Sequence, residues 1–160
     1  RVLISQECDI SVQSVHAYIA GEHGDSEIPL WSSATIGGMP LLQWEELTGK
    51  LGPAVRERIS DEVVNAAYRI IEGKGATNYA LGLEGTKILE GVLRDERRVM
   101  PVSTLLHDWH GISDVCMSVP TVLDRRGVGL RLPLPVSDDE LRKLEASAET
   151  IRSQARALGF

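Results

Sequence analysis

The stretch Val15-His16-Ala17-Tyr18-Ile19-Ala20-Gly21-Glu22-His23-Gly24-Asp25 places one histidine between two glycines at the end of an apolar run. Residues 15–19 alternate between apolar and polar side chains, which is typical of a half-buried strand. Glycine accepts a positive φ and lets a ligand approach the backbone, so residues 21–25 are predicted to form a loop that exposes the imidazole. The strand delivers His23 to this loop, and we take His23 as the candidate chemical centre.

Helical spacing surrounds this stretch. Apolar side chains recur every three or four positions over residues 1–8, 53–73, 81–92 and 141–158, which predicts four helices. The last helix follows a capping box, Ser137-Asp138-Asp139-Glu140. Gly82 and Gly85 are expected to let the third helix pack closely against a neighbour. Residues 42–50 show no convincing period and are interpreted as a loop or a short helix.

Further strands are predicted on both sides of the central helices. Residues 28–36 are apolar and rich in strand-forming side chains, and Gly37-Gly38-Met39-Pro40 ends them. Residues 99–106 are strand-like, and apolar and polar positions alternate over 115–119 and 128–134. Three short strands in a row favour an antiparallel meander.

The composition fits one soluble globular domain. The chain has 160 residues, of which 42% are hydrophobic and 25% charged, a length that suffices to bury a core. Its formal net charge of -6 argues against a nucleic-acid partner, because phosphates bind to basic surfaces. The basic residues are scattered, as at Arg56, Arg58, Arg94, Arg97 and Arg98. No apolar run approaches the roughly 20 residues of a membrane helix, so no membrane partner is expected.

Cys8 and Cys116 are the only cysteines, and both lie in apolar sequence. Two cysteines do not make a disulfide framework. We therefore predict reduced thiols in the core of a cytoplasmic protein.

The residue types around His23 suit general acid/base chemistry. A histidine side chain titrates at about pH 6.5, so it can give or take a proton at cellular pH. Such chemistry requires a carboxylate that orients the ring, and Glu22 and Asp25 are the local candidates. Side chains so close together in a tight loop often face elsewhere. The alternative interpretation is a structural loop histidine.

Other patterns are weaker. His107 and His110 lie three residues apart, but no further ligand completes a set with zinc spacing, so no metal site is expected. Gly73-Lys74-Gly75 follows a helix rather than a strand and lacks the third glycine of a dinucleotide-binding loop. The apolar stripes of the helices are expected to face the core, although part of the last stripe is long enough to contact a partner.

Three segments, residues 15–32, 74–80 and 113–120, resemble the L-lactate dehydrogenases of the lactate/malate dehydrogenase family. The first is similar to their active-site segment, and the likeness extends over essentially the whole chain. The resemblance implies an α+β fold in which an antiparallel sheet packs with long helices. It also implies that residues 1–160 form a single catalytic and substrate-binding domain.

The resemblance further implies a reaction. His23 would be the acid/base that protonates the carbonyl oxygen of pyruvate, or accepts a proton from L-lactate, while NAD exchanges the hydride. Thr77 matches a position that lines the substrate pocket, and Leu81 matches a position that faces the nicotinamide. The implied enzyme is a cytoplasmic oxidoreductase of glycolysis and pyruvate fermentation.

Arg1 and His16 match two positions that bind fructose 1,6-bisphosphate in allosteric bacterial members of the family. A cation and a titratable ring are suitable phosphate ligands. The alternative is that His16 is a strand residue on a solvent-exposed face. The resemblance also implies a homo-oligomer, and we expect a tetramer.

Parts of the family's site are expected to lie outside this chain. In the family, the carboxylate that orients the histidine and the arginine that binds the substrate carboxylate precede the position of Arg1, as does the NAD-binding Rossmann domain. No residue before Val2 caps the first helix, so we expect a fragment that is inactive when isolated. Two alternatives stay open: a malate dehydrogenase of the same family, and a non-catalytic module for sugar-phosphate binding or oligomerisation.

Overall fold

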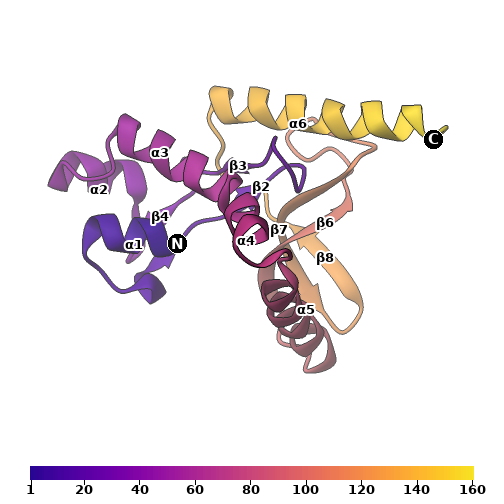
Figure 1. The fold of residues 1–160 in the computed structure, drawn as a ribbon, viewed down its shortest axis with the longest axis horizontal. Coiled ribbons are helices and arrows are strands. Elements are labelled where there is room, and N and C mark those ends of the chain that lie inside the picture. Colours follow the sequence, from indigo (N-terminus) through magenta and orange to yellow (C-terminus); the bar gives the residue numbers. More distant parts are fainter.

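The computed structural model describes residues 1–160 and confirms the α+β architecture (Figure 1). The helices are α1 (Val2–Cys8), α2 (Leu41–Thr48), α3 (Pro53–Val64), α4 (Ala66–Lys74), α5 (Asn78–Leu93) and α6 (Asp138–Ala157), with a 3-10 turn, η1, at Val12–Ser14. The strands are β1 (Val15–His16), β2 (Ile19–Ala20), β3 (Ile28–Pro29), β4 (Thr35–Ile36), β5 (Met39–Pro40), β6 (Arg98–Leu105), β7 (Cys116–Asp124) and β8 (Gly127–Arg131).

The predicted meander is confirmed. β6, β7 and β8 form one antiparallel sheet in chain order, and the β6–β7 register runs from Arg98 opposite Leu123 to Leu105 opposite Cys116. The alternation of β7 explains which face is covered, because Met117 and Val119 are buried whereas Cys116 is exposed. The prediction that both thiols lie in the core is therefore wrong for Cys116 and right for Cys8.

The two predicted strands of the first half are each divided in two. β1 pairs with β4, and β2 pairs with β3, so the chain changes partner between His16 and Ile19. Only two residues separate β1 from β2, whereas five residues, 30–34, separate β3 from β4. These five include a turn in which Ala34 N donates to Trp31 O at 3.2 Å. One continuous ladder cannot absorb this difference in length, so two short sheets form instead.

The helix predicted over residues 53–73 is also divided. Asn65 separates α3 from α4, with φ −85° and ψ −1°, and its side-chain amide donates to Asp61 O at 2.8 Å. Asparagine side chains bond to nearby backbone in this way and weaken helix continuity. Residues 42–50, interpreted as a loop or a short helix, contain most of α2 and the turn that ends it at Gly49.

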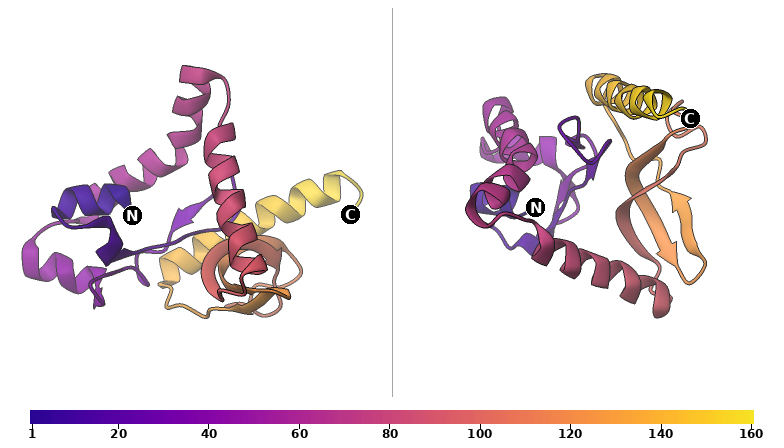
Figure 2. Two further views of the ribbon diagram at one scale, coloured as in Figure 1. Left: turned by 90° about the horizontal axis from the view of Figure 1, so that it is seen from below. Right: turned by 45° about the vertical axis from the view of Figure 1, so that its right-hand side comes forward.

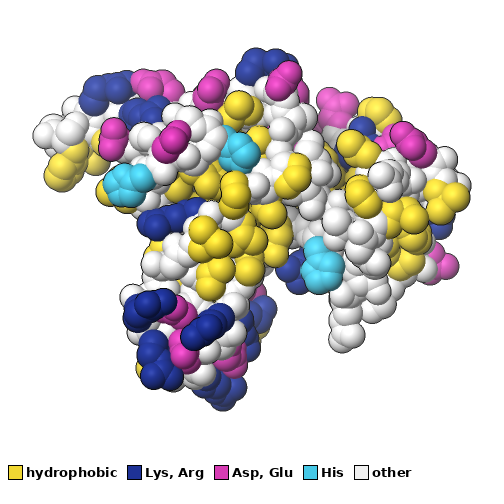
Figure 3. All heavy atoms as spheres, turned by 180° about the vertical axis from the view of Figure 1, so that it is seen from behind, with side chains coloured by type: hydrophobic (Ala, Val, Ile, Leu, Met, Phe, Trp, Pro, Cys, Tyr) yellow, Lys and Arg dark blue, Asp and Glu magenta, His cyan; other side chains and the backbone are white.

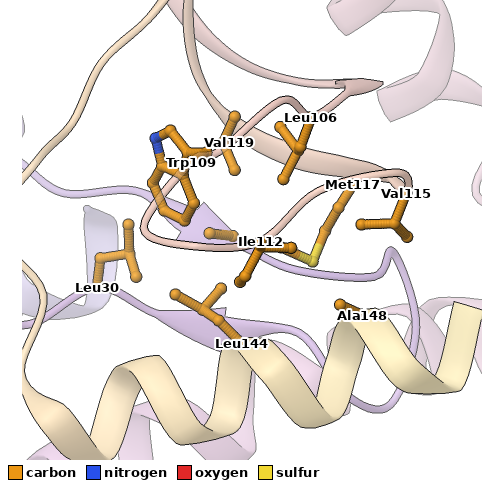
Figure 4. Packing of buried hydrophobic residues seen from close by; sticks show 10 residues of the cluster. Leu30, Leu106, Trp109, Ile112, Val115, Met117, Val119, Leu144 and Ala148 are labelled. Carbon is orange, nitrogen blue, oxygen red and sulfur yellow. The ribbon is translucent and has the colours of Figure 1, made fainter.

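Two apolar clusters form the core, and the stretch from Val15 to Ala20 enters both. The first cluster lies between β7, the β6–β7 loop, residues 20–30 and α6 (Figure 4). Its buried members are Ala20, Leu30, Leu106, Trp109, Ile112, Val115, Met117, Val119, Leu144 and Ala148. The second cluster joins α1, α2 and α3 to β1 and β4, and comprises Ile4, Cys8, Val15, Ala34, Ile36, Leu41, Leu51 and Ile59. The segment before His23 is thus held at both of its ends.

The apolar faces of α4 and α5 are exposed, which corrects the expectation that the helix stripes face the core. α5 projects away from the first-half helices in the views of Figures 1 and 2. Its exposed apolar residues and those of α4 are Tyr68, Ile70, Ile71, Tyr79, Leu81, Leu83, Leu89 and Leu93. A Cβ on Gly82 or Gly85 would meet nothing within 4 Å, so these glycines pack against no neighbour. Figure 3 shows hydrophobic side chains gathered at the centre of one face, above a group of Lys and Arg.

Candidate active site

The loop that carries His23 is fastened to the sheet at its first residue. Gly21 and Ser118 of β7 exchange two backbone hydrogen bonds of 3.0 Å, each donating to the other's carbonyl. Gly21 has a φ of +106°, a backbone conformation that residues other than glycine rarely adopt. A Cβ at this position would also lie 2.8 Å from Ser147 Oγ of α6. Both the backbone angle and the space require glycine here.

Replacing Gly21 by alanine is expected to destabilise the chain strongly. Strain at an unfavourable φ and overpacking against Ser147 together cost about 2 to 5 kcal/mol. Gly37→Ala is the matched control, because Gly37 also has a positive φ of +58° but its Cβ would meet nothing within 4 Å. Left-handed backbone alone costs about 1 to 2 kcal/mol. Urea denaturation of both variants measures the difference, and equal losses would contradict the steric part of this account.

His23 lies at the tip of the loop with its side chain 96% exposed. Its Nδ1 is 3.7 Å from Oε2 of Glu27, whose side chain is only 16% exposed. A turn, in which Glu27 N donates to Gly24 O at 3.2 Å, brings the glutamate back beside the histidine. A hollow of about 240 Å³ borders the imidazole and is lined by both residues, with Gly21, Pro101 and Ser118.

The two carboxylates singled out in the sequence make their hydrogen bonds to residues other than His23. Glu22 accepts a hydrogen bond from Ser26, and Asp25 accepts one of 2.6 Å from the Tyr68 hydroxyl of α4. The hydrogen bond to Asp25 raises the pKa of Tyr68 and ties α4 to the loop. The carboxylate nearest to the imidazole is Glu27, which sequence reasoning missed. Its four-residue spacing from His23 was the available signal, although the intervening residues form a turn rather than a helix.

Burial raises the pKa of Glu27, and the neighbouring His23 lowers it by a smaller amount. The net shift is upward. An acid whose pKa is higher in the folded chain binds more protons there than when unfolded, so stability falls as the pH rises through this range. This loss of stability is complete above the pKa that Glu27 has in the folded chain, and it is absent below the ordinary range of glutamate.

The Glu27→Gln variant is accordingly expected to be more stable than the unaltered chain at neutral pH. The gain arises because glutamine carries no charge to desolvate. The difference should shrink as the pH falls from the raised pKa of folded Glu27 to the ordinary range of glutamate. Thermal unfolding between pH 3 and pH 8, with the exposed Glu145→Gln as control, measures it. A gain that stays constant with pH would contradict desolvation as the cause.

Thr77 and Leu81 make no hydrogen bond with the histidine loop. Thr77 is half-buried at the start of α5, where its carbonyl accepts from Leu81 N at 3.3 Å. The Leu81 side chain is 74% exposed. Neither residue lines the hollow beside His23, and the link from α4 to the loop is made by Tyr68 instead.

Arg1 and His16 are both exposed near the beginning of the chain. The Arg1 guanidinium carbon lies 6.0 Å from the centre of the Tyr18 ring, and His16 stands on β1 opposite Thr35. No hydrogen bond joins Arg1 to His16.

The His107–His110 segment shows no arrangement for a metal. The His110 ring packs edge-on against Trp109 with ring centres 4.6 Å apart. No three His, Cys, Asp or Glu side chains lie close enough to hold one ion. None of the helices has both the length and the apolar character required to cross a bilayer.

Comparison with known proteins decides the family. Residues 1–158 match the lactate/malate dehydrogenase alpha/beta C-terminal domain. The chain belongs to the lactate/malate dehydrogenase family. It is 59% identical to the L-lactate dehydrogenase of Bifidobacterium animalis subsp. lactis (strain AD011), over 100% of this chain and 51% of that protein. It is 43% identical to the L-lactate dehydrogenase of Thermus aquaticus, over 100% of this chain and 52% of that protein.

Solved structures from the lactate/malate dehydrogenase family share the fold. The minor L-lactate dehydrogenase of Enterococcus mundtii in its ligands-bound form superposes with a TM-score of 0.90 at 35% identity, covering 95% of this chain and 48% of that one. The malate dehydrogenase of Aeropyrum pernix gives a TM-score of 0.85 at 29% identity, covering 98% and 51%. The chain therefore spans about half the length of the relatives it matches.

Proposed function

We propose that this chain is the catalytic half of an NAD-dependent L-lactate dehydrogenase that interconverts pyruvate and L-lactate. The observation that carries the proposal is His23. The imidazole is almost completely exposed. The loop that carries it is hydrogen-bonded to residues of β7, α4 and α6. An exposed imidazole at the tip of a loop that is held by hydrogen bonds suits proton transfer to a bound substrate.

In the proposed reaction, protonated His23 donates its proton to the carbonyl oxygen of pyruvate, and neutral His23 accepts the proton of the L-lactate hydroxyl. When bound, NAD supplies the hydride acceptor or donor for the same substrate carbon. Leu81 fits a nicotinamide contact, because a side chain that is 74% exposed on α5 offers an apolar surface to an aromatic ring. Thr77, one helical turn earlier, is proposed to contact the substrate.

The rest of the site is proposed to come from a preceding half of the full-length enzyme. That half would supply the NAD-binding Rossmann domain, the substrate-binding arginine and the carboxylate that orients His23. Glu27 does not replace this carboxylate in the proposal, because 3.7 Å exceeds a hydrogen-bond distance. The exposed apolar faces of α4 and α5 are consistent with further contacts in a larger assembly.

Pyruvate rather than oxaloacetate is the expected substrate. Two relatives that are 59% and 43% identical to this chain are L-lactate dehydrogenases, whereas the malate dehydrogenase structure is 29% identical. We predict that the full-length enzyme has a kcat/KM for pyruvate at least about tenfold above that for oxaloacetate, which corresponds to about 1.4 kcal/mol of transition-state binding. Initial rates with both ketoacids measure the ratio. A preference for oxaloacetate would favour the malate alternative.

Arg1 and His16 are proposed to bind fructose 1,6-bisphosphate in a homo-oligomer, with a tetramer expected. Their charge type and exposure support the proposal. The rival function is a non-catalytic sugar-phosphate-binding or oligomerisation module. Calorimetry with fructose 1,6-bisphosphate distinguishes them: tight binding together with a dispensable His23 would favour the module.

A further inference from the structure

Glu22, Ser26 and Ser147 form a closed ring of hydrogen bonds beneath the histidine loop. Glu22 N donates to Ser147 Oγ at 2.7 Å, Ser147 Oγ lies 3.0 Å from Ser26 Oγ, and Ser26 donates to the Glu22 carboxylate. Ser147 is completely buried in the middle of α6. The ring therefore begins and ends on Glu22, the residue immediately before His23.

The direction of each hydrogen bond in the ring follows from the number of protons. A serine hydroxyl has one hydrogen, and an ionised carboxylate has none to donate. Ser26 gives its hydrogen to the Glu22 carboxylate, so the hydrogen between the two hydroxyls must come from Ser147. Ser147 in turn accepts from the Glu22 backbone. Hydrogen bonds that point one way polarise each other, and the one that ends on a charge is the strongest.

The ring fixes both the backbone and the side chain of Glu22, but it makes no bond to His23. Within this chain the only carboxylate within 4.0 Å of the imidazole nitrogens is that of Glu27, at 3.7 Å. The ring therefore acts on His23 through the backbone of the preceding residue, Glu22. The ring also requires glycine at position 21, because a Cβ there would lie only 2.8 Å from Ser147 Oγ.

Helix α6 supplies a second support on the same side of the segment. Glu140, buried in the first turn of α6, accepts from Ser32 N at 2.9 Å and from Ser137 N at 2.8 Å. Glu140 and Ser147 are seven residues apart, which places them on one face of the helix. A single rigid helix thus holds the segment from Glu22 to Ser32 at both ends.

We propose that Ser147 is a positioning residue that, through this ring, holds the backbone from which the His23 side chain extends. The proposal rests on the proposed acid/base function of His23. A proton donor misplaced by about 1 Å can lose about 100-fold in rate, so the loss of a ring member should be visible in kcat. Substrate affinity should change little, because no ring member is hydrogen-bonded to Thr77, the proposed substrate contact.

The test combines Ser147→Ala and Ser26→Ala with Ser153→Ala, an exposed serine on the same helix, as control. In the full-length enzyme we expect Ser147→Ala to lower kcat about 10- to 100-fold while KM for pyruvate changes less than about threefold. Hydrogen exchange of the Glu22 amide should accelerate at least about tenfold. The double variant should be hardly slower than Ser147→Ala alone, since both changes break one ring. Ser153→Ala should behave as the unaltered enzyme.

Two results would overturn the proposal. An unchanged kcat with a fast-exchanging Glu22 amide would show that the ring exists but does not position His23. An unchanged exchange rate in Ser147→Ala would show that the ring does not hold Glu22. If Ser147→Ala does not fold, the half-buried Ser26→Ala carries the same kcat test. A failure of the proposed function gives a different result. In that case the His23→Asn variant would keep its activity, whatever the exchange rate of the Glu22 amide.

Discussion

Replacing His23 by asparagine is expected to lower kcat/KM for pyruvate by about 10²- to 10⁴-fold in the full-length enzyme, the usual contribution of a general acid or base. Asparagine keeps a polar side chain but cannot carry the transferred proton. The stability of the protein should change by no more than about 0.5 kcal/mol, because the His23 side chain is 96% exposed and makes no short contact. Steady-state rates and urea denaturation of the same preparation measure both quantities.

The matched control for this variant is His107→Asn. His107 is also exposed, on the loop between β6 and β7, and has no part in the proposed reaction. We expect its kinetics to equal those of the unaltered enzyme. If His23→Asn kept full activity, the assignment of His23 as acid/base would be wrong, and the binding-module alternative would gain support.

Leu144→Ala is expected to lower the free energy of unfolding by about 2 to 5 kcal/mol, the range for truncating a fully buried leucine. Leu144 is completely buried in α6 and faces Leu30 and Ile112 in the first cluster (Figure 4). Losing its side chain leaves a cavity between α6 and the segment that follows the histidine loop. A domain is typically stable by about 5 to 15 kcal/mol, so this loss is a large fraction of the total.

Leu158→Ala is the control for this cost. Leu158 follows α6 directly and is 77% exposed, so the same chemical change there removes little buried surface. We expect a loss within about 0.5 kcal/mol. Chemical denaturation of the two variants measures the difference. Equal losses would mean that α6 is not held by the first cluster.

The elements read most accurately from the sequence are those whose stability is local or whose pattern is uninterrupted. Both hydrogen bonds of the predicted capping box at Ser137 are present. Ser137 Oγ accepts from Glu140 N, and the Glu140 side chain accepts from Ser137 N. The long apolar stripe of α6 and the alternation of β7 are confirmed for the same reason. These features depend on residues a few positions apart.

Features that depend on distant residues could not be predicted. The first predicted strand is divided because β1 pairs with β4 and β2 pairs with β3. The turn at residues 31–34 separates β3 from β4 and so prevents one continuous ladder. Whether the apolar faces of α4 and α5 are exposed depends on which other elements pack against them. The spacing of apolar residues in the sequence does not contain that information. Cys116 has apolar neighbours in sequence, yet the pleat of β7 turns it outward.

The candidate site shows the same division. His23 could be singled out because glycines flank it, but the groups that hold its loop come from elsewhere in the chain. Ser147 lies 125 positions from Glu22, and Tyr68 lies 43 positions from Asp25. Neither residue type is unusual in a helix, so no local signal marks them. The roles of His23, Thr77, Leu81, Arg1 and His16 stay predictions.

The central claim is that this chain holds the proton-transferring half of a site and requires a second half for turnover. The most direct test adds pyruvate and NADH to residues 1–160 alone and, in parallel, to the full-length enzyme, and follows NADH absorbance. We predict no oxidation above background by the isolated chain and rapid oxidation by the full-length enzyme. Sustained oxidation by residues 1–160 alone, abolished by His23→Asn, would contradict the claim.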